Sequence, residues 1–165
     1  MNGDTSVSQR AWLLPAIAGL ILIALTGCAT APQQSDQEVM VGVGTDAAGH
    51  ALGVVGTPYR FGGSTPQGFD CSGLVQYSYA RAGMQVPRTM QGLWANSRPV
   101  SIKQIRPGDL LFFNQEGKLN SHVGLYIGND RFVHAPSTGK HVSTASLANR
   151  YWRQHFSSAR RPLAE

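Results

Sequence analysis

The sequence has few charged residues and only two cysteines, and both shortages narrow the classes of protein that it can encode. Charged residues make up 14% of the 165 residues and hydrophobic residues 42%, which is the opposite of the balance in disordered chains. Two cysteines, Cys28 and Cys71, are too few for a disulfide framework or a paired-cysteine zinc site. The composition therefore predicts one folded domain, and no motif in it calls for a metal or a cofactor.

The sequence also lacks an apolar run long enough to cross a bilayer. Its longest apolar run, residues 11–25, follows Arg10 and has 15 residues, whereas a spanning helix needs about 20. This length and position are typical of a secretory signal, and a polytopic membrane protein is excluded. A short membrane anchor with an incidental buried cysteine is the alternative.

The residues that end the apolar run, Leu25-Thr26-Gly27-Cys28, resemble the lipobox of bacterial lipoproteins. The resemblance implies that residues 1–27 are a signal peptide and that Cys28 carries lipid as the first residue of the mature chain. Ala29 rather than aspartate follows, which in Gram-negative lipoproteins implies sorting to the outer membrane. We therefore expect an exported chain that its lipid anchors to the outer membrane, facing the periplasm.

Acidic residues are scarce, and the formal net charge is +5. A basic chain favours a polyanionic partner, and for an exported protein the cell wall or an anionic lipid surface fits best. No basic stripe with interleaved aromatic residues is present, so we expect no nucleic acid partner. A solvated basic surface without a specific partner is an equal alternative on charge alone.

Composition and periodicity divide the chain into a polar, flexible tether over residues 28–45 and a folded domain over residues 46–165. Within the domain, apolar spacing and capping residues predict helices at 46–55, 70–82 and 89–97. Short β-rich segments bounded by turn residues predict strands at 109–114, 122–127, 131–135 and 141–144. Helices followed by a meander of strands predict an α+β domain, with the N-terminal helices packed on an antiparallel sheet.

Cys71 is a candidate nucleophile because the pattern places it in the first turn of the helix that Asp70 caps. Free N–H groups and the helix dipole favour an anion there, which predicts a lowered pKa for the thiol. The alternative is an inert buried cysteine. An unused free thiol is a liability in an oxidising compartment, so the exported location favours a functional one.

His122 and His134 lie on either side of a turn and complete a candidate catalytic group. If they pair directly across a hairpin, both imidazoles lie on one face of the sheet. Because a two-residue loop at 128–129 would put them on opposite faces, we expect an odd-length loop or a bulge. One imidazole could then take the Cys71 proton while the other orients it. We expect His50, His141 and His155 to be structural or surface residues.

Six ordered blocks of the sequence resemble the NlpC/P60 family, and in particular its single-domain lipoprotein murein endopeptidases. These blocks are GTPYRFGG at 56–63, FDCSGLV at 69–75, PRT at 87–89, RPGDLLFF at 106–113, HVGLYIG at 122–128 and FVHA at 132–135. The resemblance implies a papain-like α+β fold and hydrolysis of peptide bonds in peptidoglycan stem peptides. One departure follows the PRT block, where residues 90–94 are more apolar than the family pattern.

The resemblance also implies a role for individual residues. Cys71 falls on the nucleophile, His122 on the general base and His134 on the third, polar residue of the catalytic group. Tyr59 falls on the tyrosine at the oxyanion side of the site. The residues implied to line the substrate cleft are Asp70, Ser72 and Arg88.

The sequence thus predicts a cysteine peptidase that acts on peptidoglycan stem peptides or their cross-links. An N-acetylmuramoyl-L-alanine amidase and a non-catalytic wall-binding lipoprotein are the alternatives. Within the first prediction, both D-Glu–diaminopimelate and D-Ala–diaminopimelate bonds are possible targets, and the lipoprotein resemblance favours the second. A catalytic domain on a tether suggests a monomer that is attached to the membrane through the lipid on Cys28.

Overall fold

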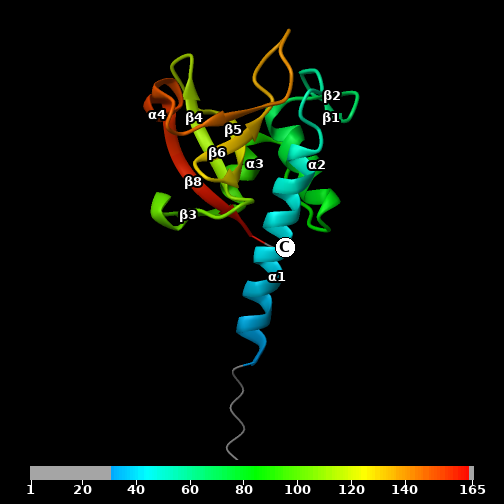
Figure 1. Cartoon of the computed structure of the whole chain (residues 1–165), viewed down its shortest axis with the longest axis vertical. Coiled ribbons are helices and arrows are strands. Elements are labelled where there is room, and N and C mark those ends of the chain that lie inside the picture. The colour runs from blue at the N-terminus through cyan, green and yellow to red at the C-terminus, as the bar shows by residue number, and fades with distance from the viewer. Residues whose placement is uncertain (1–30, 164–165) are drawn as a thin grey trace, which may run out of the picture.

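The computed structural model describes residues 31–163 and shows helices packed against one face of an antiparallel sheet (Figure 1). The predicted signal peptide and Cys28 lie outside the described residues. The helices are α1 (Ala31–Leu52), α2 (Cys71–Arg81), α3 (Met90–Ala95), α4 (Arg150–His155) and the 3₁₀ turn η1 (Ile102–Gln104). Within residues 31–163, no helix combines the length and the apolar character needed to cross a bilayer.

Six strands form the main sheet in the order β3-β8-β4-β5-β6-β7, and every pair of neighbours is antiparallel. Their bounds are β3 (Ser97–Val100), β4 (Leu110–Gln115), β5 (Lys118–Gly128), β6 (Arg131–His134), β7 (Ser143–Ser146) and β8 (Phe156–Pro162). A separate hairpin joins β1 (Ser64–Thr65) to β2 (Gly68–Phe69). The predicted α+β class, with helices on an antiparallel sheet, is confirmed.

The central strand β4 is buried on both faces, which explains its unbroken apolar run from Leu110 to Phe113. Leu110 and Phe112 belong to the cluster under the helices, whereas Leu111 and Phe113 belong to a second cluster on the other face. Trp152 of α4 packs into that second cluster. The sheet therefore has a helical layer on one face and an aromatic cluster on the other.

The structure differs from the predicted flexible tether, because the chain is helical from Ala31 onward. The helix predicted over residues 46–55 is only the C-terminal part of α1, which ends at Leu52. The reason is tertiary packing: Met40 and Val43, two turns and one turn before the buried Ala47, both contact the core. Core contacts of this kind stabilise a helix whose own sequence has weak propensity.

Helices α2 and α3 begin where the sequence predicts. The Asp70 carboxylate accepts a hydrogen bond from the Gly73 N–H at 2.7 Å, and Thr89 caps α3 in the same way. The buried face of α2 includes Tyr79, whose hydroxyl donates to the Gly108 carbonyl at 2.6 Å. These contacts fix the start of α2, and therefore Cys71, relative to the sheet.

Candidate active site

Cys71 is the first residue of α2 and packs against the sheet beside β5. The Val123 backbone, next to His122 in sequence, hydrogen-bonds the sulfur, and the backbone N–H groups of Cys71 and Ser72 also face it. The thioether of Met90 in α3 lies 3.8 Å from Sγ. The departure from the family pattern after residue 89 therefore places an apolar side chain directly against the candidate nucleophile.

The pKa of the Cys71 thiol is raised, so the lowered pKa predicted from the helix start is wrong in sign. Burial is the largest cause because it disfavours the thiolate, and the Asp70 carboxylate acts in the same direction. Hydrogen bonds from the backbone of Val123, Ser72 and Cys71 itself lower the pKa but do not compensate. The resting site therefore holds a neutral thiol, which needs a base to remove its proton before it can attack.

His122 and His134 come together across the β5–β6 hairpin, with Nε2 of His122 3.0 Å from Nδ1 of His134. Their register differs from the predicted direct pairing, because Leu125 pairs with Val133 and His134 consequently lies opposite Gly124. The two histidines are thus diagonal neighbours on one face of the sheet. The predicted bulge is confirmed by a register shift between Tyr126 and Gly128.

Both imidazoles are neutral at physiological pH. Burial lowers the pKa of His122 to about 3, helped by its neighbour His134. Burial lowers the pKa of His134 to about 4, helped by the positive charge of Lys140. If the His122 Nε2–H donates to Nδ1 of His134, Nδ1 of His122 carries a free lone pair. That tautomer makes His122 a base, and the His134 contact fixes its orientation.

Trp152 is a feature of the site that sequence reasoning missed. Its indole stacks on His122 at a centroid distance of 5.7 Å and meets His134 edge-on at 4.7 Å. It also contacts Phe113 and Phe132 of the aromatic cluster. Its position in the short, polar helix α4, with no apolar periodicity nearby, gave no signal of this role. The indole packs against both imidazoles and covers one side of each ring, which keeps water away from that side.

Tyr59 lies beside Cys71 on the loop before α2. Its pKa is raised mainly by burial and further by the negative charges available on Cys71 and Asp70. The phenol therefore keeps its proton at neutral pH and is a hydrogen-bond donor near the sulfur. The Tyr59 backbone is fixed by a 2.8 Å bond from its N–H to the Lys140 carbonyl.

Asp70, Ser72 and Arg88, predicted to line the substrate cleft, are bonded to one another. Arg88 donates to Asp70 at 2.6 Å and to Ser72 at 2.8 Å, and Asp70 also accepts from the Gly62 N–H at 3.0 Å. The Arg88 side chain stays about one-third exposed. The cluster thus joins the 62–63 loop, the start of α2 and the segment before α3. The partly exposed guanidinium at its edge is ion-paired with the Asp70 carboxylate.

Within residues 31–163, neither His141 nor His155 hydrogen-bonds to or stacks on Cys71, His122 or His134. His141 takes part in a backbone bridge to Pro58, and His155 stacks on Tyr151 at 4.2 Å. Across residues 31–163, no group of three or more histidine, cysteine, aspartate or glutamate side chains is arranged to hold a metal ion.

Curated relatives of the chain act on bacterial cell walls, according to their names. It is 41% identical over 114 residues to murein DD-endopeptidase MepH of Escherichia coli K12, which covers 66% of this chain and 42% of MepH. It is 45% identical over 111 residues to the bifunctional muramidase/DL-endopeptidase CwlT of Bacillus subtilis 168, which covers 66% of this chain and 33% of CwlT. The match thus spans less than half of either relative.

A solved structure matches the fold over the same region. An NLP/P60 protein of Staphylococcus aureus, described as similar to lipoprotein, superimposes with a TM-score of 0.65 at 35% identity. The superposition covers 74% of this chain and 42% of that one. The described fold is therefore that of NlpC/P60 domains, as the resemblance implied. Residues 56–161, which contain every candidate site residue except Cys28, match the NlpC/P60 family, and the chain belongs to that family.

Proposed function

We propose that the chain is a peptidoglycan endopeptidase that cleaves stem-peptide bonds with the Cys71 thiol. The observation that carries the proposal is a neutral, mutually hydrogen-bonded histidine pair together with a cysteine at a helix start, whose sulfur lies against the backbone of Val123, the residue after His122. Relatives named murein DD-endopeptidase and DL-endopeptidase support the substrate class. An amidase or a non-catalytic wall protein has no specific support from these relatives.

The arrangement supports acyl transfer in two steps. Nδ1 of His122 takes the Cys71 proton as the sulfur attacks the scissile carbonyl carbon, and the carbonyl oxygen becomes an oxyanion. The Cys71 backbone N–H, free because it lies in the first helical turn, and the Tyr59 hydroxyl can donate to that oxyanion. The His122 imidazolium, held by His134, then protonates the departing amine nitrogen.

The second step restores the enzyme. The acyl group is now a thioester on Cys71, and His122 is neutral again after giving its proton to the amine. His122 removes a proton from water, whose oxygen attacks the thioester carbonyl. The C–S bond breaks, the sulfur regains the proton, and the peptide leaves with a new carboxylate. No electron donor or acceptor is needed in either step.

Arg88 supplies the charge expected to select a substrate carboxylate. Its guanidinium donates to Ser72, Asp70 and the Gly63 carbonyl, and its exposed part can still donate a hydrogen bond to an anion. Stem peptides carry free carboxylates, so we assign this edge of the site to stem-peptide recognition. The D-Ala–diaminopimelate cross-link is the proposed target bond.

The purified full chain, kept in an uncharged detergent, tests the proposal on defined muropeptides analysed by mass spectrometry. We expect cross-linked dimers to yield monomers, because hydrolysis of the D-Ala–diaminopimelate bond separates the two stems. Shortened stems from uncross-linked monomers would instead assign the D-Glu–diaminopimelate bond. Release of intact stem peptides from the sugar would contradict an endopeptidase and identify an amidase.

We also propose that Cys28 is lipidated and holds the chain at the periplasmic face of the outer membrane as a monomer. The lipobox resemblance and Ala29 support the anchor and its sorting. Three lipid chains on one cysteine would give stable attachment, since each buried CH₂ contributes about 0.8 kcal/mol. Helix α1 begins three residues after Cys28, so the anchor would attach to a rigid rod rather than a loose tether.

A further inference from the structure

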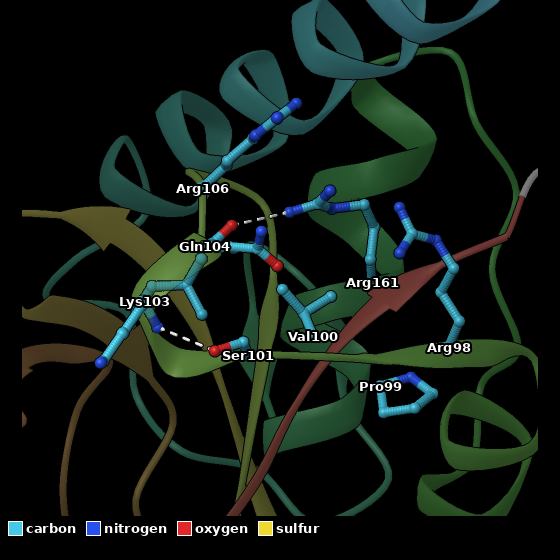
Figure 2. Close-up of a pocket in the computed structure, with 9 residues that line it drawn as sticks. Arg98, Pro99, Val100, Ser101, Lys103, Gln104, Arg106 and Arg161 are labelled. Atoms are coloured by element: carbon cyan, nitrogen blue, oxygen red, sulfur yellow. Dashed lines mark hydrogen bonds between the residues drawn. The ribbon is translucent and has the colours of Figure 1, made fainter.

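A second concave site lies away from the catalytic residues, between β3, η1 and the end of β8 (Figure 2). It is a pocket of about 450 Å³, and it contains none of the residues assigned to peptide hydrolysis. Its polar and charged lining residues are Arg98, Ser101, Lys103, Gln104, Arg106 and Arg161. The lining therefore carries four cationic side chains and no acidic one.

Three of these cations lack an acidic partner. Arg161 is neutralised by a bidentate bond to Asp109, with distances of 2.7 and 2.8 Å. Arg98, Lys103 and Arg106 form no salt bridge with any residue between 31 and 163. The pocket thus has an excess positive charge of about three that the described part of the chain leaves uncompensated.

The sheet register brings two of the cations together. Arg98 of β3 pairs directly with Arg161 of β8, and both side chains line the pocket drawn in Figure 2. Because Arg161 already pairs with Asp109, the uncompensated charge of the two is that of Arg98. An anion beside Arg98 would balance that charge, and the planar guanidinium groups suit the oxygens of a phosphate.

The pocket also has a definite place in the molecule. In Figure 1, β3 lies at the end of the domain from which α1 projects, whereas the β4–β5 turn and the β1–β2 hairpin lie at the opposite end. Helix α1, with which the described residues begin, therefore projects from the same end of the domain as the pocket. Ile102 of η1, next to Lys103, is 48% exposed on this side.

We propose that this pocket binds the phosphate groups of anionic lipid headgroups at the membrane that carries the chain. Unpaired cations with an exposed isoleucine among them match a surface of phosphates above acyl chains. Binding there would turn β3 toward the lipid and the opposite end, which carries the β4–β5 turn, away from it. The proposal concerns a site separate from Cys71 and does not depend on the peptidase activity.

The test uses the full-length chain, isotopically labelled, in uncharged detergent micelles and at low salt. Amide NMR shifts of residues 98–106 are followed while phosphatidylglycerol, phosphatidylcholine or inorganic phosphate is added in separate titrations. We expect saturable shifts with phosphatidylglycerol and none with phosphatidylcholine. Inorganic phosphate should bind at least tenfold more weakly, because a single ion lacks the adjacent charges of the lipid surface.

A matched pair of variants completes the test. Arg98→Gln with Lys103→Gln should weaken phosphatidylglycerol binding about 30-fold, since each basic group near an anionic surface contributes about 1 kcal/mol. Lys118→Gln with Arg153→Gln removes the same charge outside the pocket and should bind as the wild type does. Unsaturable shifts, equal weakening by both pairs, or equal affinity for inorganic phosphate would each overturn the proposal.

Discussion

At the residue scale, the site depends on two imidazoles that stay uncharged. His122 is 3% exposed, and its Nε2 contact to His134 at 3.0 Å would become repulsive if both rings were protonated. The same burial keeps the Cys71 thiol neutral. The candidate site thus combines a neutral thiol with two neutral imidazoles rather than a thiolate with an imidazolium, and in the proposed mechanism the proton moves only when substrate is attacked.

The histidine pair makes the stability of the fold depend on pH. The pKa values of His122 and His134 are about 3 and about 4 in the folded chain, against about 6.5 when unfolded. Between pH 6.5 and 4 the unfolded state binds more protons, so the free energy of unfolding falls as pH falls. Each histidine contributes up to about 1.4 kcal/mol per pH unit.

Urea denaturation at pH 4.5, 5.5 and 6.5 measures this slope. The His134→Gln variant should have a shallower dependence, because it removes one buried imidazole and its effect on the other. The His155→Gln variant changes a histidine outside the pair and should keep the wild-type slope. Parallel curves for wild type and His134→Gln would show that the pair does not control stability in acid.

Trp152 is the positioning residue for the two imidazoles. Trp152→Ala should lower kcat at least tenfold, because the two imidazoles lose the indole that positions them. KM should change little, because Arg88, the proposed contact for the substrate carboxylate, is not altered. Removal of the half-buried indole should also lower the free energy of unfolding by about 2–3 kcal/mol. Kinetics with cross-linked muropeptides, below the melting temperature of the variant, separate the two effects.

A conservative variant distinguishes positioning from simple packing. Trp152→Phe retains an aromatic face and should recover a substantial part of kcat relative to Trp152→Ala. A wild-type kcat in Trp152→Ala, or an effect confined to KM, would contradict the positioning role.

At the scale of elements, helix α1 packs closely enough to the domain to need a glycine. A Cβ on Gly44 would lie 2.8 Å from the Pro107 carbonyl oxygen, whereas a Cβ on Gly42 would meet nothing within 4 Å. Gly44→Ala should therefore destabilise the fold by about 1–3 kcal/mol through overpacking. Gly42→Ala should stabilise it by up to about 1 kcal/mol, because alanine favours the helix.

The two variants occupy the same helix and add the same methyl group, so each is a control for the other. Chemical denaturation gives both free energies of unfolding. Equal stabilisation by the two substitutions would mean that α1 does not pack on the 107–108 turn, and that residues 31–45 behave as the predicted tether.

Elements whose own sequence carries apolar periodicity or capping residues were predictable. Elements that are stabilised mainly by pairing or packing with other elements were not. Asp70 capping and the apolar stripe of α2 located that helix within a residue of its observed end. Strand β8 was missed because its Ser-Ser-Ala-Arg-Arg stretch has no apolar alternation, although β3 and β4 pair with it on either side. Strand β7 was placed two residues early, since the segment before it supplies only a bridge.

The residues of the candidate active site were predictable to a different degree. The spacing of His122 and His134 around a turn was enough to place both on one face, but the exact register depended on the bulge before Gly128. The sign of the Cys71 pKa shift depended on burial by the sheet, which the local helix start does not reveal. Trp152 lies at the site because α4 packs into the second core cluster, and no local sequence pattern indicates that tertiary contact.

At the scale of the whole molecule, the proposed anchor lies on the chain before α1 and the hydrolytic site on the domain after it. Cys28→Ser should lose incorporation of labelled palmitate in cells, because the lipid-accepting thiol is gone. Cys71→Ala, which removes the other cysteine, should keep the label. Equal labelling of the Cys28→Ser variant would contradict lipidation at this position.

The central claim is that Cys71 carries the acyl group during peptide hydrolysis. Its most direct test is mass spectrometry of cross-linked muropeptides and of acid-quenched protein, with wild type and Cys71→Ala compared at equal helical content and melting temperature. The account predicts a muropeptide adduct on the Cys71 peptide of wild type and a loss of turnover of about 10⁴-fold or more in the variant. Continued cleavage by correctly folded Cys71→Ala protein would contradict it.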